Sequence, residues 1–598
     1  MRGFFAACWF VALLLGAARN SGAETILVPH DHTSIQGAIR ASRDGDIVLV
    51  APGTYRESIN FLGKAVSVVA SAGASATTID AERNGSAVTF ATGEGPDSSI
   101  EGFSIVNGWG PLGGGVSCIG SSPTVRGNLI RRCGSSGALG GGIYCESSGA
   151  TIVDNEIVDG ISNFGGGIYL RGSHALVSGN TILRNEATGG GGGIYSCCTD
   201  ESTLESNDVL RNWASSGAGG GGMKLEGCRT IVYGNLLRGN VSSDDGGGLL
   251  LVDIQEADLS SNVFARNEAM RRGGGLSSDR STLRITGNLF WRNAADWGGA
   301  IHSNSSVAVD YCTIVLNEAR AAGGAIRSSD GGHTIVDSSI LWENTCELLC
   351  EEGVAISSDD SSSVSAGWSI IEGGFEGTNV SDSDPLLANI DEMNCHLRIG
   401  SPAIDSGNPS TIPPALDLDG HERQYENPDI GADEFLLHLA ARFGAVGAAS
   451  GRIEDVVLVN GSAGGPDRVV HVTGEDPIAI SILAPTGGPI SARYVLYAWL
   501  DEPDTSTAIL QKHDLGWTCF PMPLQGEPST RVLWNNLGYR KNLGKPLLPS
   551  TPAPTVLGEF PWPPGLRALA IQGLIQDLES TAVQPISVTN ALVIRPTE

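Results

Sequence analysis

Pairs of neighbouring carboxylates are the residues of this chain whose spacing best suits chemistry on a sugar polymer. Asp244-Asp245 and Asp359-Asp360 are adjacent acids. Two carboxyl groups on either side of a glycosidic bond can act as proton donor and as base or nucleophile. Both pairs lie among Ser and Gly, which are typical of turns, and neither has the His and basic pair that would bind an acidic sugar. We therefore interpret both pairs as solvent-exposed turn residues.

A second pattern suits elimination chemistry, which needs acids that bind Ca²⁺ beside an Arg or Lys base. Lys224 and Glu226 alternate, so on a strand they share one face, and Arg171 and Asp253 fall at loosely similar positions of other segments. Charged side chains at alternating positions are normally just the exposed face of a strand. We favour that interpretation over a lyase site.

Metal-ligand patterns are weak. His302 and His333 have no second His or Cys at zinc-ligand spacing. An oxygen-ligand loop for Ca²⁺ is conceivable around an Asp-x-Asp-Gly string, although the same residues also form good turns. The residues of this calcium candidate are Asp417, Asp419, Asp429 and Glu434. The sequence thus assigns no catalytic, cofactor-binding or metal-binding residue, and turns are the preferred interpretation of the calcium candidate.

Three short sequence motifs, which we call landmarks, recur together along the chain. The element that they define determines where all of these residues lie. A glycine cluster followed by an apolar residue recurs at steps of 25 to 29 residues, ending at Val116, Ile143, Ile168, Ile194, Met223, Leu249, Leu276, Ile301 and Ile326. An Asn before a short apolar run recurs at 25 to 28 residues, as Asn128, Asn155, Asn180, Asn207, Asn235, Asn262 and Asn288, with Cys312 and Ser338 next in register. Arg-Asn follows a few residues later, at 184–185, 211–212, 266–267 and 292–293.

Such a period predicts an all-β solenoid, a right-handed parallel β-helix. Each repeat holds about three short apolar alternations between Gly, Ser, Asn and Asp, which is too short for helices and typical of strands. Three strands and three turns would close one coil, and coils would stack about 4.8 Å apart. Stacked Asn side chains, such as Asn155 and Asn180, would then form a ladder of amide hydrogen bonds in a buried turn.

The same stacking predicts a disulfide bond. Cys118 and Cys145 each follow their glycine landmark by two residues, so their Cα atoms should lie about 5 Å apart. Cys346 and Cys350 are close enough in sequence for a local bridge. The adjacent Cys197-Cys198 pair and the odd number of cysteines left after removal of the first 23 residues leave the remaining pairing open.

A solenoid needs a cover at each end, and the predicted covers define the domain boundaries. Thr33-Ser34-Ile35-Gln36 fits a capping box that opens a short helix with Ile35, Ala38 and Ile39 on one face, a plausible cover for the first coil. We expect a cap and first coils over 24–115, regular coils over 116–371, last coils and a C-terminal cap over 372–435, and a separate β-rich domain over 440–598. A smaller β-sandwich is the expected fold of that last domain.

Export is expected from residues 1–23. Arg2, the apolar run Phe4–Leu15 and the small residues before Glu24 resemble a signal peptide, and no later stretch has the length of a membrane helix. The chain has 37 Lys and Arg against 66 Asp and Glu, or 35 against 66 without the signal, a net charge of −31. This acidic excess argues against nucleic acid as a partner.

Aromatic residues in or near turns are the remaining feature that suggests a ligand. Three of them, Trp213, Trp291 and Trp342, follow the same landmark, and Trp109, Trp297 and Trp368 lie in or near other turns. An external row of such rings could stack on the C–H faces of sugars. The alternative is that the rings fill the core or cover loops, and we prefer that alternative.

Several strings resemble known families. Residues 35–39 and 45–55 look like the start of pectin-degrading β-helix enzymes, of the pectin-lyase-like superfamily. The GGAI and Arg-Asn landmarks are similar to the repeats of polymorphic outer-membrane proteins. The strings at 401–409, 417–420 and 429–435 are similar to the tail of secreted bacterial β-helix proteins. The resemblance covers roughly residues 24–435 and implies a fold that serves enzymes and adhesins alike.

Two functions follow as expectations. The first is a secreted or cell-surface β-helix, without catalytic activity, that binds polysaccharide or other cell-surface partners. The second is an enzyme of this superfamily, a polysaccharide lyase, hydrolase or epimerase with an atypical site. The sequence does not give the ligand, the oligomeric state, the means of attachment to a surface or the role of residues 440–598.

Overall fold

The computed structural model describes residues 23–434 apart from 135–136, 199–200, 349–354, 399, 421–422 and 424–427. Beyond residue 434 it describes the backbone of strands β49 (Val457–Val459) to β59 (Leu592–Pro596). The predicted signal peptide, up to residue 22, lies outside the described residues. The chain forms two compact units, which are residues 1–385 with 402–433, and 386–401 with 434–598.

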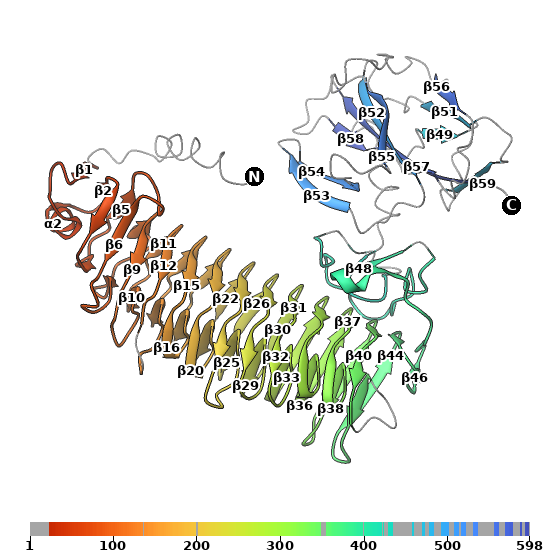
Figure 1. Ribbon diagram of the computed structural model, residues 1–598, viewed down its shortest axis with the longest axis horizontal. Helices are drawn as coiled ribbons and strands as arrows, with labels where there is room; N and C mark the ends of the chain where they lie inside the picture. The colour runs from red at the N-terminus through yellow and green to blue at the C-terminus, as the bar shows by residue number, and fades with distance from the viewer. Residues whose placement is uncertain are drawn as a thin grey trace. The chain divides into compact units, whose positions relative to one another are not determined.

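The first unit is a parallel β-solenoid, as the repeats predict (Figure 1). A regular coil has four short strands rather than the expected three. In one coil these are β17 (Ile168–Arg171), β18 (Leu176–Ser178), β19 (Thr181–Leu183) and β20 (Glu186–Gly190). The additional strand is the segment after the Arg-Asn landmark, which pairs with its equivalents in neighbouring coils.

These strands build three long parallel sheets. Strands equivalent to β17 and β18 belong to one 25-stranded sheet, because β33 (Leu276–Thr286) and β36 (Ile301–Asp310) run through the corner that separates the two strands elsewhere. A 13-stranded sheet runs from β3 (Gly53–Tyr55) to β45 (Ile370–Ile371), and an eight-stranded sheet from β16 (Ile161–Phe164) to β42 (Thr345–Cys346).

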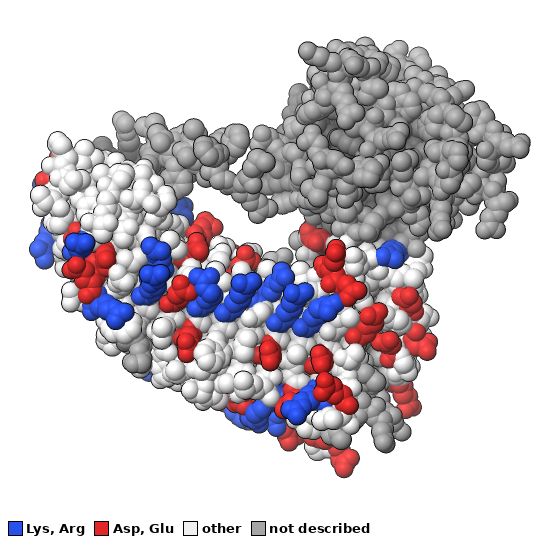
Figure 2. Space-filling model, viewed as in Figure 1, with Lys and Arg blue, Asp and Glu red and all other residues white. Residues whose placement is uncertain are grey.

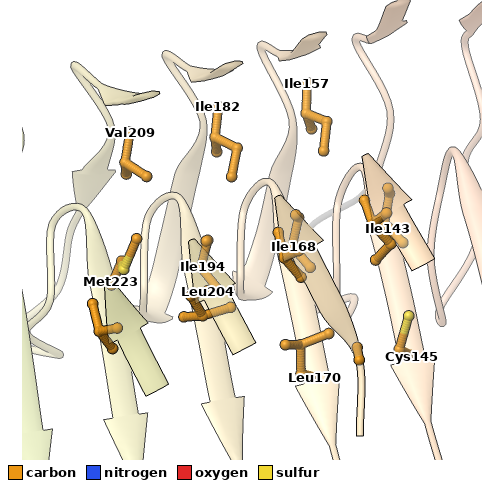
Figure 3. Packing of buried hydrophobic residues seen from close by; sticks show 14 of the residues in the cluster. Ile143, Cys145, Ile157, Ile168, Leu170, Ile182, Ile194, Leu204, Val209 and Met223 are labelled. Atoms are coloured by element: carbon orange, nitrogen blue, oxygen red, sulfur yellow. The ribbon is translucent and has the colours of Figure 1, made fainter. Parts of the chain in front are cut away.

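The core consists of rows of equivalent apolar side chains. Ile143, Ile168, Ile194 and Met223 pair in register along one sheet, and all four are fully buried (Figure 3). The Ile157–Ile182–Val209 row of the 13-stranded sheet faces the same core. Burial of each such side chain contributes about 1.5–3 kcal/mol, and only stacked coils can provide it.

The expected Asn ladder is present. Asn155 Nδ2 donates to Asn180 Oδ1 at 3.0 Å in the next coil and to the Val125 carbonyl at 2.8 Å in the previous one. Asn155 N also donates to the same Asn180 Oδ1. This pattern recurs without interruption from Asn128 to Asn288. Each side chain therefore ties together three coils and satisfies backbone groups that no strand pairing reaches.

A second ladder lies one strand further on, at the Asn of the Arg-Asn landmark. Its members, all buried, are Asn185, Asn212, Asn240, Asn267, Asn293, Asn317 and Asn344. The first ladder continues after Asn288 through Cys312 and Ser339, whose hydroxyl accepts from the Cys312 N–H. The expectation that Ser338 holds this register is wrong by one residue.

The glycine clusters allow the coils to approach one another closely. Gly191 has a φ of +62°, and a Cβ on Gly192 would lie 2.4 Å from the Gly221 carbonyl oxygen of the next coil. The backbone of one coil at this corner thus lies against the backbone of the next, and no side chain fits between them.

The predicted Cys118–Cys145 disulfide bond is wrong, because both cysteines are free. The two residues are directly paired in adjacent strands β10 (Val116–Ile119) and β13 (Ile143–Glu146), as expected. In parallel strands in register, however, the two Cα–Cβ bonds point the same way, so the Cβ atoms stay about 4.8 Å apart. A disulfide bond needs them closer, at roughly 3.8 Å. Cys350 of the other suggested bridge lies outside the described residues.

Helix α2 (Ile35–Ala41) contributes to the core at the N-terminal end of the solenoid, and Ile35, Ala38 and Ile39 are buried as expected. The cap differs from the predicted capping box by one residue. Ser34 is the N-cap and accepts from the Gly37 N–H, while Gln36 exchanges two hydrogen bonds with the backbone of Asn60.

Residues 402–433 lie along the flank of the last coils, where the first Asn ladder has ended. Asn408 Nδ2 and Thr411 Oγ1 donate to the Asp337 carboxylate, the latter at 2.7 Å. The buried Arg423 donates to the carbonyls of Asp429 and Gly431 and lies over the Tyr311 ring. These bonds hold the 402–433 segment against the last coils of the solenoid.

The second unit contains mainly antiparallel pairs, such as β52 (Ala492–Leu500) with β57 (Leu569–Asp577). Its side chains beyond residue 434 lie outside the described residues, so the β-sandwich stays a prediction. Among the residues that the structure describes, no helix is long and apolar enough to cross a membrane.

The ladder can be tested at Asn207, which is fully buried and bonded to Asn235 Oδ1 and the Val177 carbonyl. Replacement of Asn207 by Ala should lower the free energy of unfolding by about 3 kcal/mol, since several buried groups lose their partners. Urea denaturation measures this change. Asn163→Ala is the control, because the Asn163 side chain accepts only an exposed bond from Thr188, and a loss of similar size there would contradict the ladder's role.

Candidate functional site

A groove of about 580 Å³ lies on the outer face of the solenoid. Its floor is formed by consecutive strands of the 25-stranded sheet, and one wall by the turns that precede them. The strands are β21 (Ile194–Cys197), β25 (Met223–Glu226), β29 (Leu249–Val252), β33 and β36. Five coils about 4.8 Å apart give the groove a length of about 19 Å along the solenoid axis.

The floor of the groove is a row of paired residues that point outward, one from each coil. Tyr195 pairs with Lys224, which is followed in the row by Leu250, Ser277 and His302. A second row, two residues further along each strand, contains Glu226, Val252, Asp279 and Asn304. Arg171 belongs to this second row and not to the row of Lys224, and Asp253 lies just beyond it.

Stacked tyrosines form the N-terminal end of the first row. The ring centroids of Tyr144 and Tyr169 are 5.4 Å apart and those of Tyr169 and Tyr195 are 5.2 Å apart, with nearly parallel planes. All three side chains are buried, because each ring covers the next. Their faces are therefore not open to a sugar, and the row acts as a rigid support for the groove.

Tyr195 connects this support to the charged floor. Its hydroxyl donates to Glu226 Oε2 at 2.7 Å, and Lys224 Nζ lies 3.2 Å from the same oxygen and 5.6 Å from the centre of the Tyr195 ring. Burial works to raise the pKa of Glu226, but the Tyr195 hydrogen bond and the Lys224 charge outweigh it and hold that pKa below its usual value. Glu226 is therefore an ionised carboxylate held in a fixed position.

The turns that form the wall contribute an acidic pair and a basic pair. Arg271 Nη1 lies 2.6 Å from Asp244 Oδ1 in an ion pair between adjacent coils. Oδ1 of Asp245 is buried and has no hydrogen-bond partner among the described residues. Burial, and then the charge of Asp244, raise the pKa of Asp245 to about 6. Both acids lie in a turn as predicted, but neither is solvent-exposed, so that part of the prediction is wrong.

His302 forms the C-terminal end of the first row and is 2 % exposed. Its Nε2 lies 3.0 Å from Ser329 Oγ, while Nδ1 has no partner among the described residues. Burial, and then the positive charges of Arg272 and Arg327, lower the pKa of His302 to about 3. The imidazole is therefore neutral, so the C-terminal end of this row carries no charge.

Together these groups offer a polar channel with nearly balanced charge. Its lining includes three basic side chains, Lys224, Arg271 and Arg272, and four acids, Glu226, Asp244, Asp245 and Asp279. Carboxylates and guanidinium groups bind sugar hydroxyls through several hydrogen bonds at once. Asp245, with a raised pKa, and Glu226, with a lowered pKa, line the same groove, and acid–base chemistry on a glycosidic bond requires one protonated and one ionised carboxyl.

Other predicted site residues lie away from the groove. Asp359 accepts hydrogen bonds from the Asp330 N–H and from Ser361, which lower its pKa and agree with the turn interpretation. Asp429 accepts from the Asp405 N–H and Asp417 from the Asp419 N–H, within the 402–433 segment. His333 Nδ1 bonds to Ser363 Oγ. The calcium interpretation of Asp417, Asp419 and Asp429 stays a prediction.

The tryptophans do not form one external row. Trp291 and Trp342 share a register two coils apart, but Trp291 is only 2 % exposed and Trp342 is half-buried. Trp213 lies on the neighbouring sheet, at the start of β24 (Trp213–Ala214), and is 46 % exposed. Of these three, it alone offers a ring to solvent.

The sequence contained a spacing that indicates the groove wall. Gly217-Ala218, Asp244-Asp245 and Arg271-Arg272 are each 27 residues apart, one coil period. Applied to these polar pairs, the period stacks them as it stacks the Asn landmarks. The burial of Asp245 and the neutral His302 depend on side chains from several coils and left no comparable pattern.

The repeats also match a known family. The right-handed β-helix region family matches residues 56–182, 141–318 and 216–370, in overlapping segments that cover more than half of the chain. The chain therefore belongs to the right-handed β-helix family. None of the curated proteins matches it.

The raised pKa of Asp245 predicts a measurable pH dependence. Since the folded pKa of about 6 exceeds the usual 3.8, the protonated carboxyl stabilises the fold most below about pH 4, and this contribution is lost as the pH rises through 6. Asn mimics the protonated form. Relative to the parent, Asp245→Asn should therefore gain stability between pH 4 and pH 7 in urea denaturation. The same substitution at the exposed Asp97 should give no such gain, and equal curves for Asp245→Asn and parent would contradict the assignment.

Proposed function

We propose that this protein is an exported β-helix that binds polysaccharide in the groove of the five coils. The observation that carries the proposal is the convergence of acids, bases and hydroxyls from successive coils in one channel on the outer face. A repeating channel suits a repeating ligand, because each coil can present one set of hydrogen-bonding groups to each segment of the polymer.

Two further features support this function. The groove runs across the coils rather than into the core, so a long chain can enter and leave at both ends. The features typical of export, Arg2 and the apolar run Phe4–Leu15 before small residues, favour an extracellular or cell-surface location, where polysaccharides are abundant.

The test replaces both partners of one ion pair in the groove. The double variant Asp244→Ala/Arg271→Ala leaves neither charge without its partner and should weaken binding at least tenfold, about 1.4 kcal/mol. Affinity electrophoresis and calorimetry against neutral and acidic polysaccharides measure the change. The matched control is Glu101→Ala/Arg126→Ala, which removes a similar pair at 2.8 Å outside the groove. Equal affinity of both double variants would overturn the groove as the binding site.

A second candidate function, hydrolysis in the same groove, is favoured by Asp245. A carboxyl with a pKa of about 6 in the lining of the groove can donate its proton to the glycosidic oxygen as the bond to the leaving sugar breaks. The ionised Glu226 can accept a proton from the water that attacks the sugar carbon.

Turnover separates the two functions. If the groove hydrolyses its ligand, reducing ends should appear below about pH 6 and decline above it, as Asp245 loses its proton. Asp245→Asn should then lower the rate at least a hundredfold while polysaccharide binding persists. If no polysaccharide of the panel yields reducing ends, hydrolysis is excluded and the binding function stands alone.

A further inference from the structure

A row of arginines runs along the corner between the 13-stranded and eight-stranded sheets, outside the groove. In most coils the residue before the second-ladder Asn is an arginine or follows one. Arg211 and Arg266 share a register position with Gly239, whereas Arg238 lies one residue earlier and pairs with Leu210 and Ala265. We name them the arginine ridge, which comprises Arg131, Arg132, Arg184, Arg211, Arg238, Arg266 and Arg292. Figure 2 shows basic side chains in single file along the solenoid.

The backbone of the turn does not favour arginine. Arg132, Arg184, Arg211, Arg266 and Arg292 all have φ between 51° and 54°, in the left-handed region that Gly and Asn adopt more readily. In one coil the position is a glycine, Gly239, and there the preceding residue is Arg238. The positive charge is thus retained in that coil although the turn itself has its preferred residue.

The charges of the ridge are largely uncompensated. Arg184 pairs with Asp159 at 2.9 Å. Arg211, Arg238 and Arg266, from three successive coils, are exposed and form no ion pair with any described residue. Like charges on stacked coils repel one another and destabilise the pairing. A chain with a net charge of −29 has ample acids to neutralise them, yet none of the described acids pairs with these three.

The geometry of the ridge fits a linear anion. Asp159 holds this position in the coil between Arg132 and Arg184, so the uninterrupted part of the ridge runs from Arg184 to Arg292. Four coil steps of about 4.8 Å separate these two residues, and the basic side chains extend for about 19 Å. A guanidinium group binds carboxylate or sulfate through two parallel hydrogen bonds. Trp213, 46 % exposed, follows Arg211 by two residues and offers a ring on which a sugar can stack.

We propose that the arginine ridge binds a linear acidic polysaccharide, one that carries carboxylate or sulfate groups along its length. Single-file charge and a neighbouring aromatic ring fit one sugar chain laid along the solenoid. The acidic excess of the whole molecule opposes duplex nucleic acid more strongly than a single sugar chain, because duplex DNA carries one negative charge per about 1.7 Å of its axis. The ridge lies where the strands of the eight-stranded sheet begin, and the groove wall lies where they end. The two sites are therefore separate, and a failure of the ridge proposal can be distinguished from a failure of the groove proposal.

The test uses a variant that preserves the turn. Arg211→Asn/Arg238→Gln/Arg266→Asn removes three charges and places Asn where φ is positive, so the urea midpoint should stay at or above that of the parent. Affinity for a polyuronate and for a sulfated polysaccharide should fall at least tenfold, and the salt dependence of binding should weaken. The control variant, Arg40→Gln/Arg56→Gln/Arg126→Gln, removes the same charge from exposed residues elsewhere and should bind like the parent.

The outcomes are decisive in either direction. Loss of acidic polysaccharide binding in the ridge variant alone, with binding retained in the Asp244→Ala/Arg271→Ala groove variant, supports the proposal. Comparison of the affinities for the polyuronate and for the sulfated polysaccharide distinguishes recognition of carboxylate from recognition of sulfate. Equal binding of acidic polysaccharide by parent and ridge variant, an equal loss of neutral and acidic polysaccharide binding in the ridge variant, or a preference of the parent for single- or double-stranded DNA would each overturn it.

Discussion

Equivalent residues of successive coils lie directly above one another, and every other feature of the solenoid depends on this register. It lets Ile168 pack on Ile194, and it lets each Asn amide reach the next at hydrogen-bond distance. A shift of one residue in a single coil would turn its apolar side chains outward and separate its amides from both neighbours. The same register determines where polar side chains gather, since any residue type that recurs at the coil period becomes a row on the surface.

Most of the fold could be predicted because the repeat exposes this register in the sequence. The Asn155–Asn180 contact, the helix with Ile35, Ala38 and Ile39 buried, and the pairing of Cys118 with Cys145 all follow from spacing alone. Spacing alone does not give the direction in which a side chain points or which segments pair as strands. The two thiols are neighbours whose Cβ atoms point the same way, and the fourth strand of each coil depends on pairing between segments such as β16 and β20 that carry little apolar pattern.

The groove was less predictable than the fold, for a physical reason. Lys224 and Glu226 were recognised as an outward-facing pair, and the structure places both in the groove. Asp245 was assigned to an exposed turn because its neighbours are Ser, Asp and Gly, and sequence neighbours say nothing about residues one coil away. The raised pKa of Asp245 comes from burial and then from the charge of Asp244, and the neutral state of His302 likewise comes from burial and then from Arg272 and Arg327 of other coils.

The Asn ladders also give the solenoid a polarity. Within each ladder the amide-to-amide hydrogen bonds all run one way: an N–H donates to the amide oxygen of the coil of higher residue number, from Asn128 to Asn288 in one ladder and from Asn185 to Asn344 in the other. The other N–H bonds to a carbonyl, as Asn155 does to Val125 in the preceding coil. The amide dipoles are therefore aligned head to tail along the axis, and aligned hydrogen bonds polarise one another. Two parallel dipole chains run through the interior, so removal of one amide would divide a chain into two shorter ones and weaken hydrogen bonds in coils that do not touch the altered residue.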